Sequence, residues 1–481
     1  MAGTAYERLS AQDRSFFVFE DASVHMHLGG LALFDAGPLR TVEGGIDIAR
    51  IRAHIASRLH LVPRYRQRLA WVPIFNRPVW VDDGHFNLHY HVRHAALPHP
   101  GTDRQLKDLT ARILSQQLDR GKPLWELWII EGLEGDRFAM LVKTHHAVAD
   151  GISAFDLFSA LLSPAPDDTI GEPAPWTPHP APSPWALLRD ELVRQTTAPL
   201  GLTLDLARGL RAPVELCHRA AERLQAVWDL VGAGFPLPPH TLINGPIGPH
   251  RQFDWLTLDL TEVKEVKNRF GGTVNDVVLA TVAGAVRHFL TRRRVDVRGL
   301  DYRAVVPVSV RAEDERGVIN NRVSAWLMTL PIDEPDARRR LALVQATTEH
   351  LKISKQALGP EVLGQAAEYA FPGLLTVGVR LAARLHPYNL IVTNVPGPQL
   401  PLYLLGARLL GGYPQVPLFE NQGLGVALSS YCGALHWGFN ADWDLMPDLG
   451  EFVAAVGAAF EELHRAARAE RHMQVASAAR G

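Results

Sequence analysis

The chain has 481 residues, 47% of them hydrophobic, and this length predicts two domains rather than one ordinary core. The formal net charge of −2 gives no basic excess for nucleic-acid binding and no charged tail. Only two cysteines occur, Cys217 and Cys432, which excludes a disulfide framework or cysteine-based zinc site and favours a reducing, cytoplasmic compartment. Residues 1–13 lack the pattern of a signal peptide, and no uninterrupted apolar run is long enough to span a bilayer.

In chain order, the first half alternates predicted strands and helices. Apolar residues at helical spacing predict helices over residues 48–59 and 106–113. Strands are expected over residues 25–34, with a glycine kink, and over residues 78–83, 126–133 and 137–143. The last two strands should form a hairpin around the turn from Glu134 to Asp136.

A histidine motif follows this hairpin directly. His145 and His146 are adjacent, and Asp150 and Gly151 come shortly after them, ahead of another predicted helix. Histidine takes a proton from a hydroxyl near neutral pH. The carboxylate could orient the imidazole, or pair with an arginine and fix the turn. Because the motif lies between a strand and a helix, a side chain there can project into a cleft; the alternative is a histidine-rich surface loop.

A second group of histidines, His89, His91 and His94, precedes the hairpin. A metal site there is the alternative to strand surface, and we favour strand surface because no acids or cysteines accompany the group. The sequence therefore predicts no metal site.

Composition changes at Ser163, where a proline-rich segment predicts an exposed linker, followed by a helical region over residues 185–231. In the second half, strands are expected over residues 253–258, 304–310, 323–330, 390–393, 424–431 and 435–440. Helices are expected over residues 261–270, 273–289, 336–351, 361–385 and 449–466. We expect an α/β chain of two facing domains, residues 1–163 and 250–481, joined by a linker and helical region over residues 164–249.

Further short motifs accompany the histidines, in the order Pro123-Leu124-Trp125, Asn275-Asp276, Pro307 to Arg311, Asn320 to Arg322, and Asn394-Val395-Pro396-Gly397-Pro398. Together they resemble the bacterial wax ester synthase/acyl-CoA:diacylglycerol acyltransferase family, from about Leu9 to Phe460. The histidine motif alone resembles only the wider superfamily, with chloramphenicol acetyltransferase, carnitine acyltransferases and condensation domains of peptide synthetases. The first and last motifs narrow the resemblance to the wax ester and triacylglycerol branch.

The resemblance implies two chloramphenicol-acetyltransferase-like domains, each a mixed sheet flanked by helices, with an active-site tunnel between them. Long-chain acyl-CoA would enter from one side, and a diacylglycerol or fatty alcohol from the other. His146 would be the general base, with no covalent intermediate and no cofactor beyond acyl-CoA as co-substrate. Because successive residues at a strand end point to opposite faces, His145 is expected to face inward and support the site. Asp150 would pair with an arginine and organise the loop, with Arg311 as the candidate partner, and Gly151 would allow the turn.

The remaining motifs keep two interpretations each. Asp276 fits a helix cap with Thr273, whereas Asn275 could hydrogen-bond the acyl carbonyl or the oxyanion, so both are candidate substrate-binding residues. Pro123, Leu124 and Trp125 are expected to pack under the active loop or to shape the acyl channel. Asn394, Pro396 and Gly397 are expected to form a rigid structural turn at the domain junction, with the same alternative.

Three functions remain open from sequence. The first is an acyl-CoA-dependent O-acyltransferase that makes triacylglycerols, wax esters or both. The second is a condensation-type acyltransferase on other lipid or carrier-bound substrates, and the third is a catalytically silent lipid-binding homologue. The helix expected over residues 361–385 could lie on the inner membrane or a lipid droplet, or pack in the core. The preferred acceptor, the chain length and the oligomeric state stay undetermined.

Overall fold

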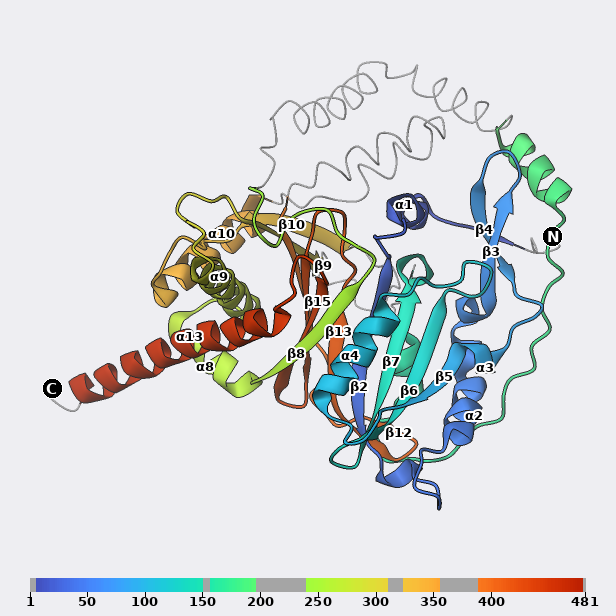
Figure 1. Cartoon of the computed structure of the whole chain (residues 1–481), viewed down its shortest axis with the longest axis horizontal. Helices are drawn as coiled ribbons and strands as arrows, with labels where there is room; N and C mark the ends of the chain where they lie inside the picture. The colour runs from blue at the N-terminus through green and yellow to red at the C-terminus, as the bar shows by residue number, and fades with distance from the viewer. Residues whose placement is uncertain (1–5, 150–155, 196–238, 310–322, 355–387, 479–481) are drawn as a thin grey trace.

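The computed structural model of the chain describes residues 6–149, 156–195, 239–309, 323–354 and 388–478. Two six-stranded mixed sheets stand side by side, and a small three-stranded sheet lies beside the N-terminal one (Figure 1). The predicted strand-and-helix alternation is confirmed for the described elements. Most of the helix expected over residues 185–231, and all of the helix expected over residues 361–385, lie outside the described residues.

The N-terminal sheet has the order β12-β13-β2-β7-β6-β5. Its strands are β2 (His27–Asp35), β5 (Val92–Ala96), β6 (Trp125–Leu133), β7 (Arg137–His145), β12 (Tyr403–Leu404) and β13 (Ala407–Gln415). The predicted hairpin is confirmed, because β6 and β7 pair antiparallel. β2 pairs with β7 without a register break. Gly29 allows close approach of the two strands, since a Cβ there would lie 1.9 Å from the Val142 carbonyl oxygen.

Both faces of this sheet are covered, which explains the nearly continuous apolar sequence of β7. On one face, Phe138 and Met140 pack with Ile51 of α2 (Ile48–Arg58) and Leu161 of α5 (Asp156–Leu161). On the other face, Leu141 packs with α4 (Asp103–Leu114) and with β8 (Arg251–Asp259) of the second sheet. The second face is therefore the junction between the two sheets.

The C-terminal sheet has the order β10-β9-β11-β14-β15-β8. Its remaining strands are β9 (Arg303–Ser309), β10 (Val323–Thr329), β11 (Leu390–Val395), β14 (Leu424–Tyr431) and β15 (Ala434–Asp442). Its helices are α8 (Leu260–Phe270), α9 (Val274–Arg292), α10 (Ala337–Ser354) and α13 (Leu449–Ala478). These helices cover the sheet face that points away from the N-terminal domain, and α13 continues beyond the body of the molecule (Figure 1).

The simple division at residue 250 needs a correction. β12 and β13 come from the range expected to form the C-terminal domain, yet they complete the N-terminal sheet. β13 pairs antiparallel with β2 and covers an edge that would otherwise expose unpaired backbone groups. β13 was not predicted from the sequence, because Gly411, Gly412 and Pro414 weaken its strand pattern. The two domains are thus interlocked by the crossing β12–β13 segment.

The small sheet consists of β1 (Glu7–Arg8), β4 (Arg77–Asp82) and β3 (Gln67–Val72), and a helix over residues 184–195 packs on it. The remaining elements are α1 (Ala11–Phe19), α3 (Leu88–His91) and four short 3-10 segments, η1 (Gly37–Leu39), η2 (Leu59–Leu61), η3 (Pro63–Arg66) and η4 (His146–Ala149). Across the described ranges, none of the helices combines the length and the apolar character needed to cross a membrane.

Candidate active site

The two histidines lie where β7 ends. His145 is the last residue of β7 and His146 opens the 3-10 segment η4, so the predicted strand-to-turn position is confirmed. Main-chain hydrogen bonds hold this point from both sides: His145 N donates to the Leu124 carbonyl at 2.9 Å, and His146 N donates to the Met26 carbonyl at 2.7 Å. Asp150, Gly151 and Arg311 lie outside the described residues.

The two imidazoles have different surroundings. His145 is buried, and its ring stacks on Phe17 with centroids 4.4 Å apart. His146 is largely enclosed but keeps part of its surface accessible, and its ring stacks on Phe16 with centroids 3.9 Å apart. Both aromatic residues come from α1, which packs directly on η4. The expected division between an inward His145 and an accessible His146 agrees with these contacts.

His146 is neutral at physiological pH. Burial is the main cause that lowers its pKa to about 4, and a hydrogen bond to its own main chain acts in the opposite direction. A neutral imidazole has a free lone pair on one ring nitrogen, which is the form that a general base requires.

A buried polar network adjoins His145, and the sequence did not reveal it. Glu20, the C-cap of α1, accepts a hydrogen bond from Arg120 at 2.6 Å and lies 3.3 Å from Nε2 of His145. His27 is 3.9 Å from the same carboxylate, and His25 stands next to His27 with ring centroids 5.5 Å apart. The available signal was a pair of acids, Glu20 and Asp21, shortly before the His25-Met26-His27 sequence.

Pro123, Leu124 and Trp125 are all buried. The Trp125 indole donates to the Tyr65 carbonyl at 2.8 Å and stacks on His91 at 4.6 Å. Because the Leu124 carbonyl also accepts the main-chain hydrogen bond from His145, the Pro123-Leu124-Trp125 motif supports the histidine turn. These contacts favour the scaffold interpretation over a direct substrate contact.

Asp276 is fully occupied as a helix cap. Its Oδ2 accepts from Thr273 N at 2.7 Å and from Thr273 Oγ1 at 2.8 Å, and its Oδ1 accepts from Thr348 Oγ1 at 2.8 Å. The carboxylate is 3% exposed, so the expected substrate contact for Asp276 needs correction to a capping role. Asn275, one residue earlier on α9, is half-buried and remains the candidate of the pair.

An apolar pocket of about 470 Å³ lies between the two sheets. Its walls are lined by Gly29, Gly30, Leu31, Ala32, Val142, Phe158, Ser159, Leu162, Val395, Pro396, Gly397, Pro398, Leu402, Leu409, Gly412, Tyr413, Pro414, Ser429, Ser430 and Tyr431. The Asn394 motif therefore combines both interpretations: β11 carries Asn394, and the turn after it forms pocket wall. A Cβ on Gly397 would lie 2.3 Å from the Ser430 carbonyl oxygen, so this turn approaches β14 closely.

Two paired strands, β2 and β7, connect the pocket to the histidine motif. Val142 precedes His145 by three residues on β7, and Gly29 follows His27 by two residues on β2. At about 3.3 Å per residue, this end of the pocket lies on the order of 10 Å from the motif along the strands. α5, which follows the motif in the chain, supplies Phe158 and Ser159 to the wall, and Leu162 directly after α5 also lines it.

Of the other histidines that the sequence singled out, His89 is exposed, and the side chains of His91 and His94 have protein partners. Nδ1 of His91 is 2.8 Å from the Trp125 carbonyl oxygen, and Nε2 of His94 is 3.1 Å from Glu131. Within the described ranges, the one group with ligand atoms close enough for a metal ion is Glu262, Glu461 and His464 on α8 and α13. That group belongs to the outer helices of the C-terminal domain and not to the histidine motif.

Comparisons with solved structures agree with this architecture. A wax ester synthase/diacylglycerol acyltransferase from Marinobacter aquaeolei VT8 superposes with a TM-score of 0.68 at 26% identity, over 96% of this chain and 99% of that chain. The starter condensation domain of rhizomide synthetase superposes with a TM-score of 0.56 at 12% identity, over 96% and 95% of the two chains, and shares the fold alone. The expected two-domain α/β fold is confirmed.

Sequence comparisons point the same way. Residues 9–278 match the model of the wax ester synthase/diacylglycerol acyltransferase catalytic domain, and residues 319–464 match the model of the family's C-terminal domain. The putative diacylglycerol O-acyltransferase Rv1760 of Mycobacterium tuberculosis is 34% identical, over 95% of this chain and 90% of its own length. The probable diacylglycerol O-acyltransferase tgs1 of the same species is 32% identical, over 93% and 94%. The predicted family and acyltransferase class are confirmed, and the chain belongs to the wax ester synthase/diacylglycerol acyltransferase family.

Proposed function

We propose that the chain transfers a long-chain acyl group from acyl-CoA to the hydroxyl of a diacylglycerol or fatty alcohol, with His146 as general base. The observation that carries this proposal is a neutral, partly accessible imidazole at the end of β7, the strand that also lines an apolar pocket. The products are triacylglycerol, wax ester or both, and the reaction uses no cofactor beyond the acyl-CoA co-substrate.

In the reaction, the lone pair of His146 takes the proton of the acceptor hydroxyl as its oxygen attacks the thioester carbonyl carbon. The tetrahedral intermediate then collapses, the carbon–sulfur bond breaks, and the imidazolium returns the proton to the leaving thiolate. A thioester is already activated, so no covalent enzyme intermediate is needed. General base catalysis of this kind contributes typically ~10²–10⁴-fold to the rate.

The pocket is suited to an acyl chain. Its volume of about 470 Å³ falls in the roughly 300–1,000 Å³ range of small-molecule sites. Its lining contains no charged side chain, and the hydroxyls of Ser429, Tyr413 and Tyr431 bond within the protein. Ser429 Oγ donates to the Gly412 carbonyl at 3.0 Å, and the hydroxyls of Tyr413 and Thr257 pair at 3.1 Å. The wall therefore offers an acyl chain mainly carbon surface, which favours burial of methylene groups.

Four residues complete the proposal. Asp150 organises the motif loop by pairing with an arginine, for which Arg311 is the candidate, and Gly151 allows the turn. Asn275 hydrogen-bonds the acyl carbonyl or the developing oxyanion. These roles rest on the family's motif pattern.

The chain also works at a lipid surface, as a cytoplasmic protein peripheral to the inner membrane or lipid droplets. Support comes from the tip of the β3–β4 hairpin, where Ile74 is 86% exposed, and from the adjacent helix over residues 184–195, where Trp185 is 79% exposed. Beneath them, the fully buried Glu191 carboxylate pairs with three guanidinium groups, those of Arg8, Arg77 and Arg194. Apolar tips above a cluster of arginines suit a phospholipid interface.

The decisive assay incubates the full-length chain with palmitoyl-CoA and either hexadecanol or dipalmitoylglycerol, and measures ester product and free CoA. We expect His146→Ala to lower kcat by about 10²–10⁴-fold with either acceptor. His179→Ala is the control, because His179 pairs with Asp82 and its side chain is 75% exposed on the surface, away from the motif. Full esterification by His146→Ala would refute the base assignment. If the intact chain used neither acceptor, the proposed substrates would be wrong and carrier-bound substrates would be tested next.

A further inference from the structure

Glu20 is a buried carboxylate beside the histidine motif, at the C-terminal end of α1. Its side chain is 4% exposed, and its Oε2 accepts from Arg120 Nη2 at 2.6 Å and faces Nε2 of His145 at 3.3 Å. Burial raises the pKa of Glu20, but the hydrogen bonds from His145 and Arg120 and the charge of Arg120 prevail and lower it. Glu20 is therefore ionised at neutral pH.

The opposite edge of the His145 ring identifies its tautomer. Nδ1 of His145 accepts a hydrogen bond from the Ala147 main-chain N–H at 3.1 Å. An accepting nitrogen carries a lone pair, so the proton of the neutral ring must be on Nε2, the atom that faces Glu20. The carboxylate accepts that N–H and stabilises this tautomer over the other.

The same ring links Glu20 to the turn that carries His146. Ala147 belongs to η4 and follows His146 directly, so its N–H is part of the main chain that orients the His146 side chain. Phe17 stacks on the His145 ring at an interplanar angle of 9°, and the Arg120 guanidinium lies 5.5 Å from the Phe17 ring centre. His145 is thus held at both edges by hydrogen bonds and on its face by an aromatic ring.

We propose that Glu20 is a positioning residue for acyl transfer: through the Nε2–H tautomer of His145 and the Ala147 N–H, it fixes the turn from which His146 acts. Glu20 does not touch substrate. The inference rests on the proposed role of His146, and its test includes a measurement that is independent of activity.

The kinetic test compares Glu20→Ala and Glu20→Gln in the full-length chain. Glutamine keeps an acceptor oxygen near His145, whereas alanine removes it. We expect Glu20→Ala to lower kcat about 10- to 100-fold, the scale seen when a partner that orients a functional histidine is lost, with KM for palmitoyl-CoA nearly unchanged. Glu20→Gln should restore most of the rate. Glu20→Asp, which withdraws the carboxylate from His145, replaces the alanine variant if that variant does not fold.

Glu131→Ala is the matched control. Glu131 also faces a histidine, His94, at 3.1 Å and accepts a main-chain hydrogen bond from Ile46 at 2.7 Å, but it does not contact the motif. Removing it breaks a similar carboxylate–histidine pair in the same domain. We expect the kcat of Glu131→Ala to stay within about twofold of that of the unmodified chain, because Glu131 is not a partner of the histidine motif.

The direct test is the ¹⁵N NMR spectrum of histidine-labelled protein, with the His145 signals assigned by their loss in His145→Gln. The intact chain and Glu20→Gln should show His145 as a single Nε2–H tautomer, and Glu20→Ala should show a mixture. A Glu20→Ala protein that keeps the single tautomer or the full kcat overturns the positioning role. If His146→Ala stayed active, the assignment of His146 as the base would be wrong. The NMR measurement of the His145 tautomer would still test separately whether Glu20 holds the His145 ring.

Discussion

Phe16 of α1 stacks on His146 with ring centroids 3.9 Å apart and an interplanar angle of 28°. The phenyl ring excludes water from one face of the imidazole, and burial is the main cause that lowers the pKa of His146 to about 4. α1 ends 126 positions before His145 in the chain. Through Phe16, this distant helix helps to keep the proposed base unprotonated. This relationship leads to two predictions about pH.

The first prediction concerns the pH dependence of the intact chain. Because the pKa of His146 is about 4, the base stays unprotonated from pH 8 down to about pH 5. We expect log kcat/KM to be flat over that range and to fall with unit slope only near pH 4. The profile is measured with palmitoyl-CoA, and circular dichroism at each pH verifies that the chain is folded. An inflection near pH 6.5, the ordinary histidine value, would contradict the burial of His146.

The second prediction concerns Phe16→Leu. Leucine fills part of the space but cannot stack, so water gains access to the imidazole and the pKa of His146 should rise toward its ordinary value. We expect the acidic limb of the kcat/KM profile to move upward by about one pH unit. Phe19→Leu is the matched control, because Phe19 packs near Phe419, with ring centroids 6.1 Å apart, and not on either histidine. Equal shifts in both variants would show that α1 acts only through general stability.

The sequence predicted the position of the motif because that position depends on local patterns. An apolar strand ending at two histidines is readable from residues 137–146 alone. The partners of those histidines were not readable, since Glu20 and Phe16 precede them by more than a hundred residues. A single sequence carries no distance information across that separation, so the stacking and the Glu20 contact needed the structure.

The fold shows the same limit. Helix boundaries were predicted to within a few residues where caps are local, as for α9, which was expected over residues 273–289 and spans Val274–Arg292. The crossing of β13 into the N-terminal sheet was not predicted, because strand partners depend on tertiary edges rather than on the strand's own sequence. For Asp276 the structure confirmed the local capping interpretation.

A third prediction concerns acid stability. Burial lowers the pKa of His25, His27, His91, His146 and His436. The unfolded chain protonates histidine near pH 6.5, whereas folded His146 and His436 resist protonation until about pH 4. The unfolded state therefore binds more protons in this window, and the free energy of unfolding should fall as pH drops from 6.5 toward 4.

His436→Leu tests that linkage away from the motif. Its pKa is lowered to about 4 by burial, so its protonation opposes folding by up to roughly 3 kcal/mol at the acidic end of the window. Urea unfolding at pH 7.5, 6 and 5 should show a weaker pH dependence in this variant. The exposed His89, changed to leucine, is the control and should leave the slope unaltered. A slope in His436→Leu equal to that of the intact chain would contradict the prediction.

A fourth prediction concerns the lipid surface. Ile74→Ser and Trp185→Ser remove the most exposed apolar side chains of the hairpin tip and its neighbouring helix. Because inserting such a side chain is worth on the order of 1.5–3 kcal/mol, each change should weaken binding to phospholipid vesicles about 10-fold. Vesicles of phosphatidylcholine with and without an anionic lipid, measured by co-sedimentation, separate the apolar contribution from that of the arginines.

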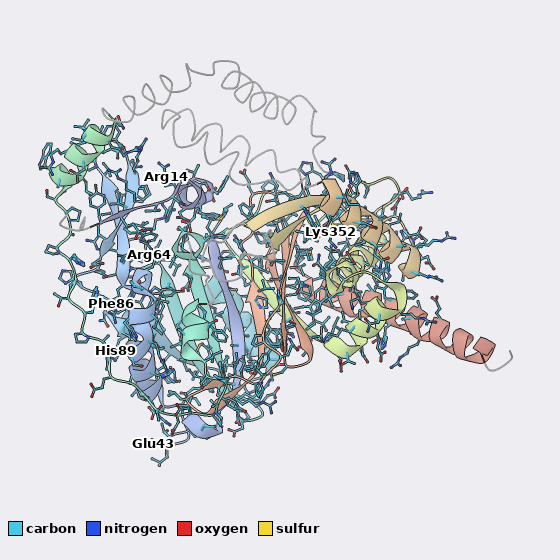
Figure 2. All side chains as sticks on the ribbon, turned by 180° about the vertical axis from the view of Figure 1, so that it is seen from behind. Arg14, Glu43, Arg64, Phe86, His89 and Lys352 are labelled. Carbon is cyan, nitrogen blue, oxygen red and sulfur yellow. The ribbon has the colours of Figure 1, made fainter. Side chains whose placement is uncertain are left out.

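Val42→Ser is the control for the lipid surface. Val42 is completely exposed, and its neighbour Glu43 lies at the bottom of the molecule in Figure 2, far from Arg14 of α1 near the top. Vesicle binding should be unchanged in this variant. Equal weakening by Val42→Ser would mean that the chain has no preferred lipid-facing side, and unaltered binding by Ile74→Ser and Trp185→Ser would place the contact elsewhere.

The last prediction concerns chain length. Gly412 lies on β13 opposite Ala32 and lines the pocket, and a Cβ built on it meets no atom within 4 Å. Gly412→Leu should therefore be accommodated by the backbone while its side chain occupies pocket volume. We expect kcat/KM for palmitoyl-CoA to fall about 10-fold, as the energy of one or two lost methylene contacts implies, with decanoyl-CoA little affected. Gly457 on α13 also has no neighbours within 4 Å of a built Cβ but lies outside the pocket. Gly457→Leu should therefore leave kcat/KM unchanged for both substrates. If Gly412→Leu lowered kcat/KM equally for palmitoyl-CoA and decanoyl-CoA, the pocket would not hold the acyl chain.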